Sequence, residues 1–485
     1  MRSIRVAAMG AALVLTVSSC GTDGDSGSSG AGCRASAESR KPSKSWDRPA
    51  DFDNDGYPDA VDVVTGEPAT AKGTPPVALS RGAIGPLAVF MGGRDGLRPT
   101  GRPLADGVVP PGSGGKWKEG FARTYTADLD ADGYTDVLAA QLIPKNEYVD
   151  KYTRSMVLFR GGPNGLGAEP VVVPYPSGPA HTQSPPTAIG DFNGDDRADV
   201  LAPVPGKAPG EIGQILYGPF GSDGRPASTR DLTVRGPAPD LGYYSSLLSA
   251  DIDADGRTDL LLTVETDDPE DDYEGGTYHP LRWFRGTAEE GMVEAESPPG
   301  TYSANITTGT DFDADGYPDT LLTGPGPGPK GGGLPMLRGG PDGFRPGVRS
   351  LRSDALGGPL VTGDITGDGR AESVSAIGTG KYATTKKILV SELTATKDGA
   401  RMRALQRIAH NDKALRGAAS RTAFGSTLLL LDAEQDGCDD LLTGSAFTGS
   451  SYRRGGYWVL RGGADGLRTN GIRHYGLREL GLLKK

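Results

Sequence analysis

A short acidic loop recurs along this chain and limits the folds that it can adopt. The pattern is Asp-x-Asp-x-Asp-Gly-x-x-Asp, whose residues are numbered as positions 1 to 9. It is complete in the loops that begin at Asp51, Asp128, Asp251 and Asp311, and altered in those that begin at Asp191, Asp364 and Asp432. Successive loops begin 53 to 77 residues apart. Such a period predicts an architecture of repeated supersecondary units.

Oxygen atoms at alternate positions of each loop suit calcium, which takes about six to eight oxygen ligands. Positions 1, 3, 5 and 9 would supply side-chain oxygens and position 7 a backbone carbonyl. We therefore expect several structural Ca²⁺ ions. The predicted ligands, loop by loop, are Asp51, Asp53, Asp55, Tyr57 and Asp59; Asp128, Asp130, Asp132, Tyr134 and Asp136; Asp191, Asn193, Asp195, Arg197 and Asp199; Asp251, Asp253, Asp255, Arg257 and Asp259; Asp311, Asp313, Asp315, Tyr317 and Asp319; Asp364, Thr366, Asp368, Arg370 and Glu372; Asp432, Glu434, Asp436, Cys438 and Asp440.

Position 6 is glycine in every loop except the one that begins at Asp191. Glycine adopts a positive φ at no steric cost, so we expect the backbone to double back there. Asp196 holds this position in the exception, and aspartate tolerates the left-handed region better than most residues.

An EF-hand or dockerin-like loop is the rival interpretation, because it also alternates acidic residues. Such a loop needs a carboxylate at position 12 and a helix after it. Position 12 is acidic only at Asp62. Short apolar runs such as Leu260-Leu261-Leu262 follow the loops instead, and such runs are typical of buried strands.

A single Asp-rich turn is more often a solvated turn than a metal site. Seven in register favour calcium. A cage closed by protein oxygens leaves no open position for a substrate, which favours a structural role over a catalytic one.

A second signature follows the loops: a strand, a Gly-Gly turn and a further Gly-Leu or Gly-Phe. Clear copies are at Gly92-Gly93, Gly161-Gly162, Gly339-Gly340 and Gly462-Gly463, and the sixth repeat has no clear copy. Gly-Gly between apolar runs is typical of a hairpin. With an apolar strand before each loop, one period gives four antiparallel strands, which predicts a propeller blade. The chain is therefore predicted to be an all-β, seven-bladed β-propeller.

The acidic pattern followed by Leu-Leu, and preceded by strands like Phe424-Gly425-Ser426, resembles the FG-GAP or VCBS-type repeats of the integrin α-subunit propeller and of bacterial secreted relatives. The resemblance covers roughly Trp46 to the C-terminus. It implies calcium loops between the first and second strands of each blade. The Gly-Ala-Pro element of integrin repeats is poorly kept, so integrin ligand specificity is not carried over.

The N-terminus is interpreted as a targeting segment. Its apolar run from Val6 to Val17 is shorter than a spanning helix. With Val17-Ser18-Ser19-Cys20 it resembles a bacterial lipoprotein signal, which implies cleavage before Cys20 and lipid on its sulfur. We expect the lipid to hold the protein at the extracellular face of the cell membrane, and a simple secretory signal with release is the alternative. The expected domains are residues 1–19 as signal peptide, 20–45 as flexible Gly/Ser-rich tether and 46–485 as propeller.

Two further cysteines, Cys33 in the tether and Cys438 in the last loop, are candidates for a disulfide if the compartment is oxidising. A bridge between them could close the ring of blades. Two unpaired thiols are the alternative.

Function is expected on the face opposite the acidic loops, where the connections between second and third strands vary most. Tyrosine and arginine on rigidly held loops are favoured in binding sites. Merely solvated insertions are the alternative. The candidate ligand-binding residues are Trp117, Tyr148, Tyr152, Tyr273, Tyr278, Tyr382, Tyr452 and Arg453.

The sequence gives little support for catalysis. Its four histidines share no spacing, and we find no nucleophile elbow or phosphate loop. No basic patch suggests nucleic acid, and the net charge is −11. We expect a monomeric binding or adhesion module for an extracellular protein or polysaccharide, with contact to the membrane through the lipid alone. A carbohydrate-active enzyme or its subunit, and a purely structural envelope protein, are the alternatives.

Overall fold

The structure is a computed structural model of the 485-residue chain. It divides into Met1–Gly32, which lies outside the described residues, and a compact unit, Cys33–Lys485. The structure describes residues 33, 49–64, 85–104, 120–144, 152–174, 188–202, 211–233, 246–263, 265–266, 277–278, 281–289, 291–296, 305–312, 315–323, 334–345, 349–352, 360–378, 385–396, 399–409, 412, 415, 424–448 and 454–482.

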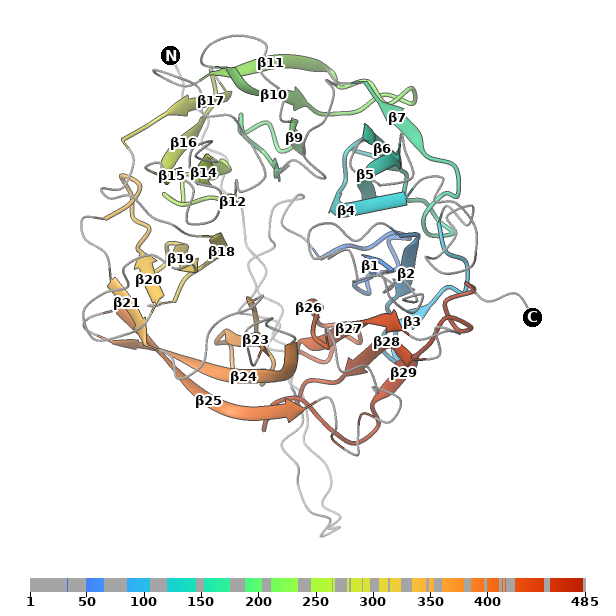
Figure 1. Ribbon diagram of the computed structural model, residues 1–485. Coiled ribbons are helices and arrows are strands. Elements are labelled where there is room, and N and C mark those ends of the chain that lie inside the picture. The colour runs from blue at the N-terminus through green and yellow to red at the C-terminus, as the bar shows by residue number, and fades with distance from the viewer. Residues whose placement is uncertain are drawn as a thin grey trace, which may run out of the picture. The chain divides into compact units, whose positions relative to one another are not determined.

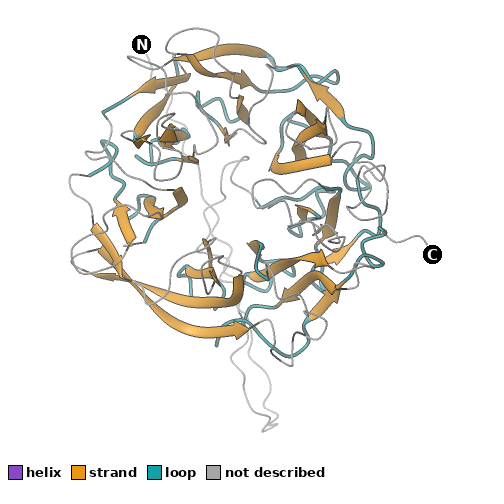
Figure 2. Cartoon of the chain, in the orientation of Figure 1, coloured by secondary structure: helices purple, strands orange, loops and turns teal. Residues whose placement is uncertain are grey.

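Within Cys33–Lys485 the described strands form seven antiparallel blades arranged in a ring (Figure 1). The described residues contain strands and loops but no α-helix (Figure 2). In chain order the blades are β1 (Ala60–Val63), β2 (Leu87–Met91) and β3 (Arg98–Pro99); β4 (Gly120–Ala127), β5 (Asp136–Pro144), β6 (Tyr152–Phe159) and β7 (Val171–Val173); β8 (Ala188–Gly190), β9 (Asp199–Ala202), β10 (Glu211–Tyr217) and β11 (Ser228–Thr233); β12 (Ser246–Ala250), β13 (Asp259–Thr263), β16 (Arg282–Thr287) and β17 (Gly291–Glu294); β18 (Asn305–Thr310), β19 (Asp319–Thr323), β20 (Leu334–Leu337) and β21 (Arg349–Arg352); β22 (Leu360–Gly363), β23 (Glu372–Gly378), β24 (Thr385–Thr396) and β25 (Gly399–Ala409); β26 (Thr427–Leu431), β27 (Asp440–Thr448), β28 (Arg454–Leu460) and β29 (Arg473–Tyr475).

The acidic loops lie where the repeat predicted them, between the first and second strands of the blades. In blades 2 to 7 the second strand begins at position 9, as β13 does at Asp259. The three leucines that follow in β13 are fully buried, because a blade packs against a neighbour on each side. The prediction of a seven-bladed, all-β propeller is confirmed, and a helix of the EF-hand type does not follow the described loops.

Seven apolar clusters hold the ring together, one at each junction between successive blades. The cluster of blades 1 and 2, for example, contains Phe52 from the first and Phe159 from the second, both fully buried. The remaining clusters join blades 2 and 3, 3 and 4, 4 and 5, 5 and 6, 6 and 7, and 7 and 1. Apolar burial is therefore distributed around the ring rather than gathered in one core.

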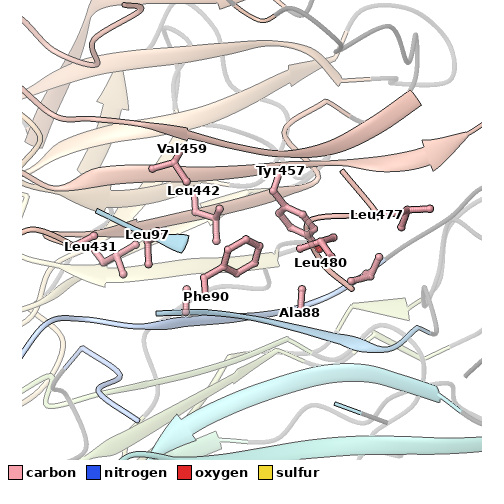
Figure 3. Close-up of a cluster of buried hydrophobic side chains, with 12 residues drawn as sticks. Ala88, Phe90, Leu97, Leu431, Leu442, Tyr457, Val459, Leu477 and Leu480 are labelled. Atoms are coloured by element: carbon pink, nitrogen blue, oxygen red, sulfur yellow. The ribbon is translucent and has the colours of Figure 1, made fainter. Parts of the chain in front are cut away.

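The junction of blades 7 and 1 closes the ring (Figure 3). Phe90 of blade 1 meets Tyr457 of blade 7 edge to face, with ring centroids 5.1 Å apart. Leu477 and Leu480, which follow the last strand, pack in the same cluster. The two ends of the propeller thus meet through side chains of the first and last blades.

Three blades depart from the four-stranded pattern. Blade 1 has three described strands, and the strand expected before Asp51 lies outside the described residues. Blade 4 carries an added hairpin, β14 (Glu265–Thr266) with β15 (Thr277–Tyr278), between its second and third strands. In blade 6, β25 pairs in parallel with β21 of blade 5, so these two blades share one eight-stranded sheet.

Candidate metal centres in the acidic loops

Each acidic loop is folded by hydrogen bonds between its own carboxylates and its own backbone. In loop 1, Asp51 accepts the N–H groups of Asp55 at 3.1 Å and Gly56 at 2.9 Å. Asp55 in turn accepts the N–H of Tyr57 at 2.9 Å. Loops 2 to 7 repeat all three bonds. Positions 1 and 5 therefore shape the turn.

The backbone at position 6 has a positive φ in all seven loops, as expected from the glycines. Gly56 has φ of 91°, and Asp196, the exception, has φ of 62°. All six described residues at position 4 also have a positive φ, including Asn54 at 54°. The loop thus makes two left-handed steps, and the second was predicted from sequence.

The acid at position 9 links each loop to the third strand of its blade. In blade 1, Asp59 accepts the N–H of Phe52 at 2.7 Å through one oxygen and that of Gly92 at 2.7 Å through the other. Blades 2 to 5 repeat both bonds. A Cβ on Gly92 would lie 2.2 Å from the carbonyl oxygen of Pro58, so only glycine fits there. The acidic loop and the glycine turn therefore form one unit.

Neighbouring loops also contact one another around the ring. The carbonyl of Phe52 in loop 1 accepts the N–H of Gly162 in blade 2 at 2.9 Å. The same bond closes the ring, from Gly93 of blade 1 to the carbonyl of Ala433 in loop 7 at 3.0 Å. These loops consequently share one side of the propeller.

In several loops the carboxylates converge closely enough to hold a cation. Three groups each have one oxygen per residue within 4.8 Å of the others: Asp51, Asp53 and Asp59; Asp128, Asp130 and Asp136; Asp251, Asp253 and Asp255. In loop 2, Asp130 Oδ1 is buried and has no hydrogen-bond partner, and the same holds for Asp440 Oδ2 in loop 7. An oxygen-only donor set with buried, unsatisfied oxygens fits a hard cation such as Ca²⁺.

Burial makes the position 9 carboxylates costly to ionise. Desolvation raises the pKa of four of these aspartates, and of the glutamate in loop 6, to about 7: Asp59, Asp136, Asp199, Asp259 and Glu372. In loop 7, burial and then the nearby Glu434 raise the pKa of Asp440. Positive charge in the loop would favour the ionised forms.

Arginine supplies such a charge in four blades, and the sequence analysis missed it. The arginine just before the first glycine of the turn pairs with an acid at position 3 or 5 of its own loop. The pairs are Arg160 with Asp130, Arg285 with Asp253 at 2.6 Å and Asp255 at 3.4 Å, Arg338 with Asp315 at 2.7 Å, and Arg461 with Glu434 at 2.7 Å. The signal was present, because Arg-Gly recurs at the same point of the repeat.

The position 7 residues directly follow the positive-φ turn of each loop. The side chains of two of them, Arg257 and Tyr317, contact other side chains. Arg257 pairs with Asp255 at 2.8 Å, and the guanidinium of Arg345 lies over the ring of Tyr317 at 5.4 Å. Whether the position 7 carbonyls bind a cation stays a prediction. Asp313 lies outside the described residues.

A disulfide joins Cys33 to Cys438, with the two Cα atoms 5.7 Å apart. This fixes one point of the expected tether to position 7 of loop 7. Asp436 lies close to both sulfurs, but sulfurs spent on a disulfide are not thiolate ligands, so we assign no metal to this group.

The opposite face is described only in part. Tyr152 begins β6 opposite Pro144, and Tyr278 ends β15 opposite Glu265, both in connections between second and third strands. The backbones of Tyr152 and Tyr278 thus lie in connections of the predicted kind, but in two different blades. The other six candidates, Trp117, Tyr148, Tyr273, Tyr382, Tyr452 and Arg453, lie outside the described residues, as does Cys20. No helix among the described residues is long and apolar enough to cross a membrane.

Comparison with protein families supports the repeat. Residues 128–202 match the model of the FG-GAP-like repeat, and this segment runs from the start of loop 2 to the end of β9. It therefore covers one full period, and the resemblance to this repeat is confirmed there.

The chain was also compared with curated proteins and with solved structures. A search of curated proteins finds no match. Among solved structures, the crystal structure of the V. cholerae biofilm matrix protein Bap1 is similar, with 9% identity, 90% of this chain and 83% of that chain covered, and a TM-score of 0.30.

Proposed function

We propose that this chain is a calcium-stabilised β-propeller that binds a protein or polysaccharide outside the cell and is held at the membrane by lipid on Cys20. The observation that supports it most is the repeated convergence of carboxylates seen at Asp51, Asp53 and Asp59. The metal would be structural, because the loop and the glycine turn that it would brace belong to the blade framework.

Calcium would act here by neutralising carboxylates that the fold holds together. Desolvation already raises the pKa of Asp59 to about 7, so the ionised form is disfavoured without added positive charge. A cation that binds the folded loops but not the unfolded chain stabilises the fold, by roughly 2.7 kcal/mol when its free concentration is about 100 times its Kd. The rigid ring then presents the loops of the opposite face as a binding surface.

The first test measures thermal unfolding in calcium, magnesium and chelator. We expect calcium to raise Tm, and Asp53→Asn in loop 1 to reduce that rise. Asp223→Asn is the control, since Asp223 is exposed and lies outside the loops. An identical Tm in calcium and chelator would reject a structural role for the metal.

The second test concerns the binding face. Glycan and protein arrays, run with calcium and with chelator, should give saturable binding that changing Tyr148, Tyr273 and Tyr452 together to alanine abolishes. Binding that survives the triple change would move the site to another surface. Turnover of a labelled polysaccharide would favour an enzyme instead, and no binding on any array would favour a structural envelope protein.

A further inference from the structure

The residue that precedes the glycine turn differs among the blades, and blade 6 has no clear copy of that turn. This residue is arginine in blades 2, 4, 5 and 7, as given above. Blades 1 and 3 carry Met91 and Tyr217 at the same point. In blade 6 the register pairs position 9, Glu372, with Glu392. The same acidic loop is therefore present seven times with different residues beside it, so the loops can be compared within one molecule.

In blade 2 the arginine brings positive charge to the acidic loop. Arg160 pairs with Asp130, whose side chain is only 11% exposed. Its guanidinium also donates to the carbonyls of Phe220 and Gly221 in blade 3. It thus supplies positive charge to the loop and ties the loop to the next blade.

The other three arginines make equivalent contacts. Arg285 reaches Asp253, whose side chain is fully buried, and Asp255. In blade 5, Arg338 and Arg345 both reach Asp315 at 2.7 Å. In blade 7, Arg461 pairs with Glu434 and donates to the carbonyl of Asp95 in blade 1 at 2.6 Å. A buried or partly buried loop acid therefore has a guanidinium partner in each of these blades.

Blade 1 has the same convergent oxygens without that charge. Met91 packs in the apolar cluster of blades 1 and 2, beside Gly165. Within the described part of the chain, Asp53 converges with Asp51 and Asp59 but forms no ion pair with arginine or lysine. In blade 6, Glu392 pairs instead with Arg403 of the neighbouring strand. Loop 1 thus has convergent carboxylates and no arginine partner of this kind among the described residues.

We propose that these arginines decide which loops hold calcium. A guanidinium and a divalent cation a few ångströms apart repel each other, so calcium must displace the arginine or bind weakly beside it. Blades 2, 4, 5 and 7 are braced by their own arginines, whereas blade 1, whose carboxylates converge without one, depends on calcium. The inference rests on the proposed calcium binding and goes beyond it by naming the loops that take the metal and the residue that excludes it.

A reciprocal exchange between blades 1 and 2 tests the proposal. Arg160→Met gives blade 2 the residue of blade 1, and Met91→Arg gives blade 1 the residue of blade 2. Equilibrium dialysis with Ca²⁺ should show one more tight ion per chain for Arg160→Met and one fewer for Met91→Arg. We expect each change to alter the affinity of its own loop by about tenfold or more.

Arg160→Lys separates charge from packing. It removes the planar guanidinium and its paired hydrogen bonds but keeps the positive charge. The number of tight ions should then stay at the wild-type value. An added ion in Arg160→Lys would mean that shape, rather than charge, excludes the metal, and would overturn the proposal.

Hydrogen exchange locates the ions independently of their number. Adding calcium to the wild-type protein should slow exchange in loop 1, and in loop 2 only after Arg160→Met. If the wild type binds no calcium at all, the proposed function fails. If it binds calcium but neither exchange variant changes the count or the protected loops, the arginine proposal alone fails.

Discussion

The junction of blades 7 and 1 differs from the junction of blades 1 and 2, although both carry an apolar cluster. Between blades 1 and 2 the chain is continuous, and Phe52 of blade 1 packs in one cluster with Phe121 and Phe159 of blade 2, which meet edge to face at 5.7 Å. Between blades 7 and 1 the described residues add a polar network. Asp62 accepts hydrogen bonds from Thr427 at 2.6 Å and Tyr457 at 2.8 Å.

Two further links reinforce the closing junction. Tyr475 donates to the carbonyl of Leu97 at 2.8 Å. The Cys33–Cys438 disulfide connects the segment before blade 1 to blade 7. At the junction of blades 1 and 2, one side chain, Thr135, accepts the N–H of Asp51 at 3.0 Å. The closing junction adds two hydrogen bonds between side chains at Asp62 and one covalent bond.

The largest expected effect comes from removing the aromatic side chain at the centre of the closing junction. Phe90 is fully buried against Tyr457 and Tyr475. Phe90→Ala should lower the free energy of unfolding by about 3–5 kcal/mol, measured by urea unfolding in calcium. Phe159→Ala is the matched change at the continuous junction. If Phe90→Ala alone costs less than about 1 kcal/mol, the closing junction does not hold the ring.

A smaller effect is expected from the disulfide. Changing Cys33 and Cys438 together to serine should cost about 2–4 kcal/mol, because the bridge restricts the unfolded chain over a separation of 405 residues. Comparison with the wild type in reducing buffer controls for the substitutions themselves. Equal stability of oxidised wild type and double variant would show that the bridge adds nothing to closure.

The smallest effect is the pH dependence of the Asp62 network. Asp62 as a residue is half-buried, but its carboxylate is enclosed by the bonds to blade 7, and this desolvation raises its pKa. The folded state therefore holds the proton more tightly than the unfolded chain. The stabilisation that this raised pKa provides is fully present below the ordinary carboxyl pKa near 4. It is lost as the pH rises through the pKa of Asp62 in the folded state.

Asp62→Asn removes this titration, so its stability relative to the wild type should rise from acid to neutral pH. Unfolding curves in saturating calcium, across that range, would measure the difference. A constant difference at every pH would mean that Asp62 has the same pKa in the folded and unfolded states.

The fold could be predicted because its signals are local and repeated. The acidic loop, the glycine turn and the strand after position 9 each lie within a few residues, and seven copies reinforce one another. From the sequence, a Cys33–Cys438 disulfide and two unpaired thiols were both possible, because pairing depends on where Cys33 lies in space.

The candidate site was predicted less completely, for a physical reason. The bond from Asp59 to Gly92 and the pair of Arg160 with Asp130 join residues of different strands. Which residues meet across strands depends on the register of strand pairing, and a local sequence motif does not specify that register. Most of the predicted ligand face lies in residues outside the described part, so that prediction stays open.

The disulfide also determines how the molecule bears a mechanical load. A pull on the chain from its N-terminal side reaches Cys33 first and passes through the bridge into loop 7. The tension then bypasses residues 34 to 437, so blade 1 is not peeled from the ring strand by strand. Reduction would reroute the same force through blade 1, and a stretched molecule would begin to unravel there.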